Sequence, residues 1–263
     1  MANRLWDRAG SLPVPVDDRP RAELSTLPAG GLPTVAELFT FMRDAELRFA
    51  RLRMRIEERT ATTDGEHLVA MDVALRHPGE ARVTTTEPGR GTAGNYEVWI
   101  SDGETVRTYS GRHRLGTRRP VREPVRGLSG SEGRDLPGMS RVYWPVTPLP
   151  METLADVFVH PAGYCQNVLS TGRCWVSGTD AVAGREAIVV ECDHPRTIEV
   201  AADRPDFHIA VAVDRDTGCI LRLVETIGHQ VTRRAEAVDF GPDAPLASTT
   251  FEFEFPADTT TIY

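Results

Sequence analysis

The spacing of apolar positions changes once, abruptly, near residue 50. Before that point apolar residues recur at helical spacing, which predicts a helix with one apolar face. Thr34 and Glu37 stand at its start in the arrangement of a capping box, where each side chain accepts a backbone N–H from the first turn. The apolar positions are Val35, Leu38, Phe39, Met42 and Ala45.

After Phe49 the period becomes two. Leu52, Met54 and Ile56 alternate with arginines, as in a half-buried strand. Further strand-like runs follow, most of them joined by Gly- or Asp-containing turns of hairpin type. We expect strands at 67–76, 81–87, 95–102, 105–111, 112–118, 173–178, 185–194, 208–216, 219–228, 230–240 and 251–256. Sequential antiparallel strands joined this tightly predict a meander.

The clearest hairpin is "VAVDRDTGCILRLVET", residues 211–226. Gly218 stands in its turn where a left-handed residue is needed. In a curved sheet, Val211 and Val213, with Ile220 and either Leu221 or Leu223, would face the concave side. They would then supply either apolar lining for a cavity or ordinary core.

Two segments interrupt the strand pattern. Residues 1–33 are rich in Pro, Gly and charge and predict an extended, mobile arm, while residues 34–263 predict a single domain. Within that domain, residues 119–150 contain many Pro, Gly and Arg and predict a long loop insertion. The next segment, 151–161, predicts a short helix that ends at Pro161.

Composition narrows the classes of function. The formal net charge of −8 argues against nucleic-acid binding, which needs a basic face. No Lys occurs, and arginines gather in 107–126, where they form either a solvated loop or a site for anionic head groups or an acidic partner. No secretory signal or transmembrane run is visible, so we expect a cytoplasmic protein, or an extracytoplasmic one if a leader is missing.

Few residues suggest catalysis. The sequence has no Gly-x-Ser-x-Gly, phosphate-binding loop, dinucleotide fingerprint or zinc spacing, and we expect neither a cofactor nor a metal. If the chain is an enzyme, Cys192 and His194 are the first residues to test. Cys165 and Cys174 would join in a small disulfide loop in an oxidising compartment, and buried free thiols are the alternative.

The order of several segments resembles a known family. "DAVAGREAIVVECDH", "AVDRDTGCILRLVET" and "TRRAEAVDFGPDAPLASTTFEFEFP" follow one another in the C-terminal third, and "YEVWISDGETVRTYSGRHRLGTR" lies upstream. With a capped helix leading into a long first strand, this is similar to the bacterial lipoprotein-carrier (LolA-like) superfamily over about residues 34–256. That superfamily includes mycobacterial lipid-binding lipoproteins and the sensor domain of an anti-sigma regulator.

The resemblance implies a mostly β (α+β) fold. Its strongly curved antiparallel sheet forms an incomplete β-barrel, plugged by one long and one or two short helices. It also implies that the space between sheet and helices holds acyl chains or other hydrophobic ligands. This sequence departs from the pattern in lacking a signal peptide and a lipobox cysteine, and in carrying the 119–150 insertion.

We therefore expect non-catalytic binding of an acyl or lipid-like ligand. Polar rim residues Arg53 or Arg107 would orient its head group. The alternatives are a protein-interaction module that acts through the Arg/Pro loop or the N-terminal arm, and an enzyme of specialised metabolism. The ligand-binding residues that we expect are Phe39, Met42, Trp99, Tyr109, Tyr143, Trp144 and Met151, for which ordinary core packing is the competing explanation.

Overall fold

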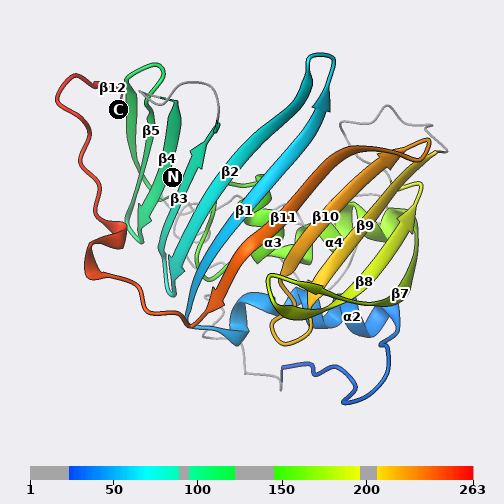
Figure 1. Cartoon of the computed structure of the whole chain (residues 1–263). Coiled ribbons are helices and arrows are strands. Elements are labelled where there is room, and N and C mark those ends of the chain that lie inside the picture. The colour runs from blue at the N-terminus through cyan, green and yellow to red at the C-terminus, as the bar shows by residue number, and fades with distance from the viewer. Residues whose placement is uncertain (1–23, 89–94, 122–144, 196–205, 263) are drawn as a thin grey trace, which may run out of the picture.

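The computed structural model describes residues 24–88, 95–121, 145–195 and 206–262. These residues form one twelve-stranded mixed sheet with a few short helices (Figure 1), so the mostly β prediction is confirmed. The sheet order is β12-β6-β5-β4-β3-β2-β1-β11-β10-β9-β8-β7. Two meanders therefore meet where β1 pairs with β11, whereas the sequence predicted one. Every pairing is antiparallel except that of β12 with β6.

The strand bounds follow the predicted runs closely. The first meander contains β1 (Arg51–Thr62), β2 (Gly65–Arg76), β3 (Glu80–Thr86), β4 (Tyr96–Asp102), β5 (Thr105–Ser110) and β6 (Leu115–Pro120). The second contains β7 (Arg173–Val182), β8 (Arg185–Asp193), β9 (Phe207–Asp214), β10 (Ile220–Ile227) and β11 (Gln230–Pro242).

The predicted first helix is α2 (Val35–Arg43), followed by the 3-10 helix η2 (Ala45–Arg48). Its capping box is present: the Glu37 N–H donates to Thr34 Oγ1 at 3.2 Å, and the Thr34 N–H donates to Glu37 Oε2 at 2.8 Å. Leu38, Phe41 and Met42 are buried, which places Phe41 on the apolar face as well.

The short helix predicted at 151–161 is present, and a second short helix follows it. α3 (Leu154–Val159) ends at His160, and Pro161 begins α4 (Pro161–Asn167), which leads to η4 (Leu169–Thr171). Proline is compatible with the first position of a helix, because its missing N–H would have no partner there. α3 thus ends directly before Pro161, as predicted, whereas the second helix that begins at this proline was not placed by the sequence.

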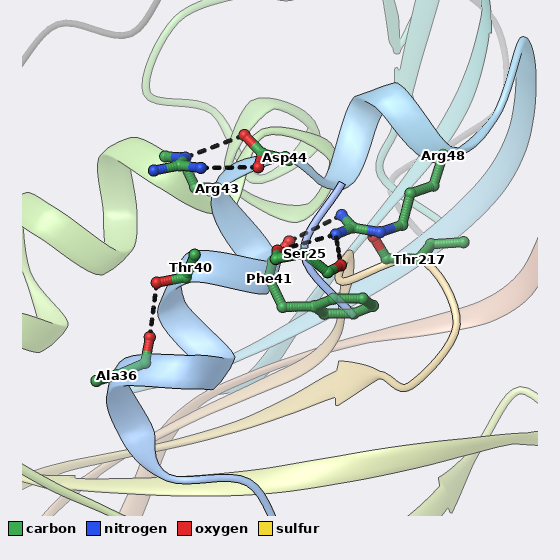
Figure 2. Close-up of polar contacts among 8 residues, drawn as sticks. All are labelled: Ser25, Ala36, Thr40, Phe41, Arg43, Asp44, Arg48 and Thr217. Carbon is green, nitrogen blue, oxygen red and sulfur yellow. Dashed lines mark hydrogen bonds and ion pairs between the residues drawn. The ribbon is translucent and has the colours of Figure 1, made fainter. Parts of the chain in front are cut away.

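Arg48 connects α2 to the turn of the hairpin at 211–226 (Figure 2). Its guanidinium carbon lies 3.8 Å from the centre of the Phe41 ring. The same group donates to the carbonyl oxygens of Phe41 at 2.8 Å and Thr217 at 3.4 Å, and to that of Ser25 at 2.7 Å. Arg215 holds the preceding chain by donating to the Pro28 carbonyl at 3.0 Å. Residues 24–33 are therefore attached to α2 and to the β9–β10 turn.

The sheet has two faces with different coverings. We call the face that carries Leu52, Met54 and Ile56 the inner face, and the face that carries Arg53 and Arg55 the outer face. The inner face joins α2, α3 and α4 in the large hydrophobic cluster. In Figure 1, α3 and α4 lie behind the strands of the second meander, and α2 lies near the lower ends of β7–β9.

The outer face of β4 and β5 is covered by residues 243–259, which we call the C-terminal strap. Phe251 is buried there against Val98, Ile100 and Tyr109, with Phe253 and Phe255 packed beside them. The strand predicted at 251–256 was wrong: this segment starts in η5 (Ser248–Phe251) and forms no ladder, and the short β12 (Thr260–Ile262) follows it. The alternating phenylalanines pack on the sheet instead of pairing within it.

Candidate functional site

The centre of the inner face is filled with side chains. Val211, Val213 and Ile220 are fully buried, as are Leu221 and Leu223. They share one cluster with Phe158 of α3 and Met42 of α2. The hairpin at 211–226 is therefore core beneath the helices rather than the wall of an open cavity.

A polar cluster ends this apolar surface. Glu58 continues the inward positions of β1 after Ile56, and Glu225 continues those of β10 after Leu223. Arg233 of β11 lies between them and donates to Glu58 Oε1 at 2.6 Å and to Glu225 Oε1 at 3.3 Å. The side chains of Glu58, Arg233 and Glu225 are only 18%, 26% and 15% exposed. Charges this far from water are costly unless they are paired, which explains the triad geometry.

Tyr164 of α4 brings a hydroxyl to the same place. The hydroxyl oxygen is buried and has no hydrogen-bond partner among the described residues. Burial, reinforced by the negative charge of Glu225, raises the pKa of Tyr164 well above its usual value. The phenol therefore stays protonated and able to donate a hydrogen bond, and a buried donor without a partner is costly.

Apolar side chains continue from this polar cluster across the inner face of β2–β4. Val69 of β2 pairs with Glu58, and Met71 pairs with Ile56. Trp99 of β4 pairs with Val83 of β3. Val69 and Trp99 pack against the large cluster but are only partly buried. An apolar strip thus leads across β2–β4 toward buried hydrogen-bonding groups, an arrangement that suits an amphiphile.

The structure divides the predicted ligand-binding residues between the two faces. Met42 is fully buried, Phe39 is partly buried on α2, and Trp99 lies on the inner face. Tyr109 lies on the outer face under the strap, because it pairs with Val98 while Trp99 pairs with Thr108. A single cavity between sheet and helices cannot include both aromatic residues, since neighbouring residues of a strand point to opposite faces.

The predicted rim residues also lie on the outer face. Arg53 pairs with Asp239 at 3.0 Å. Arg107 donates to the Phe253 carbonyl of the strap at 2.9 Å. Both side chains therefore lie on the face opposite to α2, α3 and α4. Met151 is 64% exposed, and Tyr143 and Trp144 lie outside the described residues.

The outer face has a hollow of its own, about 600 Å³ in volume, between β1–β3 and residues 245–250 of the strap. Arg53, Arg55 and Asp72 line it. Their charges are already paired, since Arg55 donates to both oxygens of Asp72 at 2.9 Å. Arg82 also lines the hollow and donates to Thr84 Oγ1 at 3.3 Å and to the Thr250 carbonyl at 3.2 Å.

Cys192 is fully buried and poorly suited to act as a nucleophile. The Cys192 thiol donates to the Leu169 carbonyl at 3.3 Å and is buried, and its pKa is raised. A raised pKa opposes a thiolate nucleophile. Cys165 and Cys174 are free thiols in the structure. Within the part of the chain that the structure describes, no cluster of His, Cys, Asp and Glu is arranged to hold a metal ion.

Sequence reasoning missed the polar cluster, although the sequence contains a signal for it. Glu58 and Glu225 occupy inward positions at the ends of otherwise apolar alternations. A charged residue that continues the buried face of a strand indicates a partner on a neighbouring strand. What the sequence does not show is that β11 supplies that partner to both.

Comparisons with known proteins give similarity of structure. No protein-family model matches the chain, and no curated protein matches its sequence. The Pseudomonas aeruginosa MucA/MucB complex contains a chain 16% identical, with 87% of this chain and 63% of that chain covered at a TM-score of 0.48. Mycobacterium tuberculosis lipoprotein LppX is 10% identical over 81% of this chain and 96% of its own, at a TM-score of 0.41.

The LolA superfamily protein NE2245 from Nitrosomonas europaea is also similar. It is 9% identical, with 84% of this chain and 98% of that chain covered at a TM-score of 0.34. The predicted resemblance to LolA-like proteins, an anti-sigma regulator and a mycobacterial lipoprotein is thus confirmed as structural similarity. This chain spans less than two thirds of the MucB chains.

Proposed function

We propose that this chain binds a hydrophobic ligand of the acyl or lipid-like class on the inner face of its sheet, without catalysis. In this proposal the sheet acts as an incomplete barrel with α2, α3 and α4 on its concave side. The apolar tail of the ligand lies along Val69, Met71 and Trp99. Its polar end meets the hydroxyl of Tyr164 beside Arg233.

One observation carries the proposal: the buried Tyr164 hydroxyl lacks a partner among the described residues where an apolar strip meets the triad of Glu58, Arg233 and Glu225. A protein gains stability when such a donor is satisfied, and a bound ligand with an acceptor would satisfy it. The name of LppX as a lipoprotein, and of NE2245 as a member of the LolA superfamily, is consistent with this class of ligand.

Tyr164→Phe tests the proposal, because it removes only the hydroxyl. The probe is cis-parinaric acid, a fluorescent long-chain fatty acid, titrated into the purified full chain. We expect the variant to keep its melting temperature and to bind about tenfold more weakly, as the loss of one hydrogen bond of about 1.5 kcal/mol predicts. Tyr96→Phe on the outer face is the matched control. Equal affinities of both variants and the wild type would contradict the proposal.

A protein partner is the second candidate, because MucB has been solved in complex with MucA. The Arg/Pro loop that would bind such a partner lies mostly outside the described residues. Deletion of 122–138 separates the two: it would abolish partner binding and leave the fatty-acid titration unchanged. Among the described residues, no helix is long and apolar enough to cross a bilayer.

A further inference from the structure

Two cysteines face each other across neighbouring strands. Cys174 of β7 pairs directly with Cys192 of β8. Residues directly opposite in an antiparallel pair have Cα atoms about 4.5–5.5 Å apart, within the range of about 4.4–6.8 Å that a disulfide spans. Both thiols donate to one acceptor, the Leu169 carbonyl oxygen, at 3.0 Å and 3.3 Å. The two sulfur atoms are therefore held on the same side of the pair.

We propose that Cys174 and Cys192 are a redox-active dithiol that closes to a cross-strand disulfide by exchange with a small-molecule disulfide such as oxidised glutathione. This pairing differs from Cys165–Cys174, the pair that their nearness in the sequence favours. The inference does not depend on the ligand-binding function.

The two thiols differ in the way that such an exchange requires. Cys174 is partly exposed on the last strand in the sheet order, whereas Cys192 is buried. A hydrogen bond from Cys192 lowers the pKa of Cys174, and the same contact, together with burial, raises the pKa of Cys192. Cys174 is thus the more accessible and more readily deprotonated thiol, and Cys192 is the thiol that resolves the mixed disulfide.

The exchange balances in two steps. The Cys174 thiolate attacks one sulfur of oxidised glutathione, which breaks the glutathione disulfide, forms a mixed disulfide and releases one glutathione thiolate. The mixed disulfide removes the contact with the Cys174 thiolate, which is the largest cause of the raised pKa of Cys192. Cys192 then gives its proton to the released thiolate and attacks Cys174 Sγ, which releases the second glutathione as a thiolate. The second glutathione thiolate takes up the proton that Cys174 released on becoming a thiolate. The protein thus loses two protons and two electrons, and one oxidised glutathione becomes two reduced molecules.

The surroundings can accept this change. Leu169 loses two S–H donors on oxidation, but its carbonyl keeps the Gly172 N–H at 3.0 Å. Gly172 leaves room beside the two thiols, because a Cβ at this position would lie only 2.7 Å from Cys192 Sγ. The other cysteines are poorer candidates. Burial raises the pKa of Cys165, whose thiol contacts Met42 Sδ at 3.6 Å, and it raises the pKa of Cys219 to about 12.

Peptide mapping tests the pairing directly. Trypsin cleaves after Arg141, Arg173 and Arg185, so that Cys165, Cys174 and Cys192 fall on three separate peptides. The reduced full chain is incubated with oxidised glutathione, alkylated, digested without reduction and analysed by mass spectrometry. We expect peptide 174–185 linked to peptide 186–196. Full alkylation of all cysteines, or a link between Cys165 and Cys174, would overturn the proposal.

Three variants assign the roles. Cys192→Ser should stop at a mixed disulfide between glutathione and Cys174, and Cys174→Ser should leave Cys192 unreacted. Cys165→Ser is the matched control and should keep the cross-strand bridge. Oxidation should raise the melting temperature of the wild type and of this control by a few degrees. It should not raise the melting temperature of Cys192→Ser or Cys174→Ser. An internal disulfide in Cys192→Ser would count against the pair.

Discussion

The two halves of the sheet bury opposite faces. Around β1 and β7–β11, the inner face is core under three helices, while at β4 and β5 the outer face is buried by the strap. β4 shows both situations, since Trp99 faces inward and Val98 faces the strap. The strand period is the same in both halves. The covering element therefore decides which face becomes core, and alternation alone shows only that a strand has two faces.

The helices and the strap also differ in how much apolar surface they bury. The helix-covered cluster contains large side chains that are fully buried, such as Phe158, Leu38 and Met42. The strap-covered cluster contains four buried residues, and Phe253 and Phe255 are only partly buried. Hydrophobic stabilisation scales with the apolar area removed from water. The helix-covered half should accordingly contribute most of the stability.

Truncation of one phenylalanine in each half gives the largest expected effect. Phe158→Ala should lower the free energy of unfolding by about 3–5 kcal/mol, because a fully buried ring leaves a cavity. Phe251→Ala should cost about 2 kcal/mol, because the strap can move to fill the space. Urea unfolding of both variants measures this difference. A larger loss for Phe251→Ala would reverse the comparison.

A buried histidine beneath the helices should make stability depend on pH. Burial by itself would lower the pKa of His160, but the carboxylates of Glu46 and Asp156 outweigh it and raise the pKa to about 9. The charged form binds these carboxylates, with Nδ1 2.9 Å from Asp156 Oδ1 and Nε2 3.4 Å from Glu46 Oε2. The stabilisation is thus full below about pH 6.5 and is lost as the pH rises through 9.

We expect this loss to amount to about 3 kcal/mol between pH 6 and 10, measured by urea unfolding across the range. His160→Gln should remove that part of the slope. His208→Gln is the control, since the pKa of His208 is also raised, by Glu191 and Asp193, but its side chain is half-buried and screened by solvent. An unchanged slope in His160→Gln would contradict the assignment.

Two glycines give the smallest expected effects. Gly218 has a φ of 83°, and a Cβ there would lie 3.1 Å from the Phe41 ring and carbonyl of α2. Gly218→Ala should cost about 1–2 kcal/mol in thermal or urea unfolding. A Cβ at Gly116 would lie 2.8 Å from the Phe255 ring of the strap, which can swing away. Gly116→Ala should lower the free energy of unfolding by less than about 1 kcal/mol. A cost equal to that of Gly218→Ala would show that the strap is as rigid as the helix.

Much of the fold could be predicted from local pattern. The alternation of apolar and polar residues predicted eleven of the strands, and the capping box at Thr34 predicted the start of α2. The strap could not be predicted in this way, because Phe251, Phe253 and Phe255 alternate like a strand but pack on a sheet that other residues form. The helix that begins at Pro161 could not be placed from the sequence, because proline both ends and begins helices, and only the packing of α3 and α4 decides between the two.

The candidate site was predicted less well than the fold. Met42 and Trp99 lie on the predicted side of the sheet, but Tyr109, Arg53 and Arg107 do not. Their faces depend on register relative to β1, which residue type does not encode. The polar cluster of Glu58, Arg233 and Glu225 needs three strands from both ends of the chain to meet, and this is a property of the topology.

The central claim is that the inner face, and not the outer face, holds the ligand. It is tested by native mass spectrometry of Trp99→Arg and Trp175→Arg, loaded with the same fatty acid. Trp175 is the matched control because it lies on the outer side of β7 and is 39% exposed. With both variants folded by circular dichroism, we predict that Trp99→Arg loses the bound mass and that Trp175→Arg keeps it. Retention of the ligand by Trp99→Arg, or its loss from Trp175→Arg alone, would contradict the account.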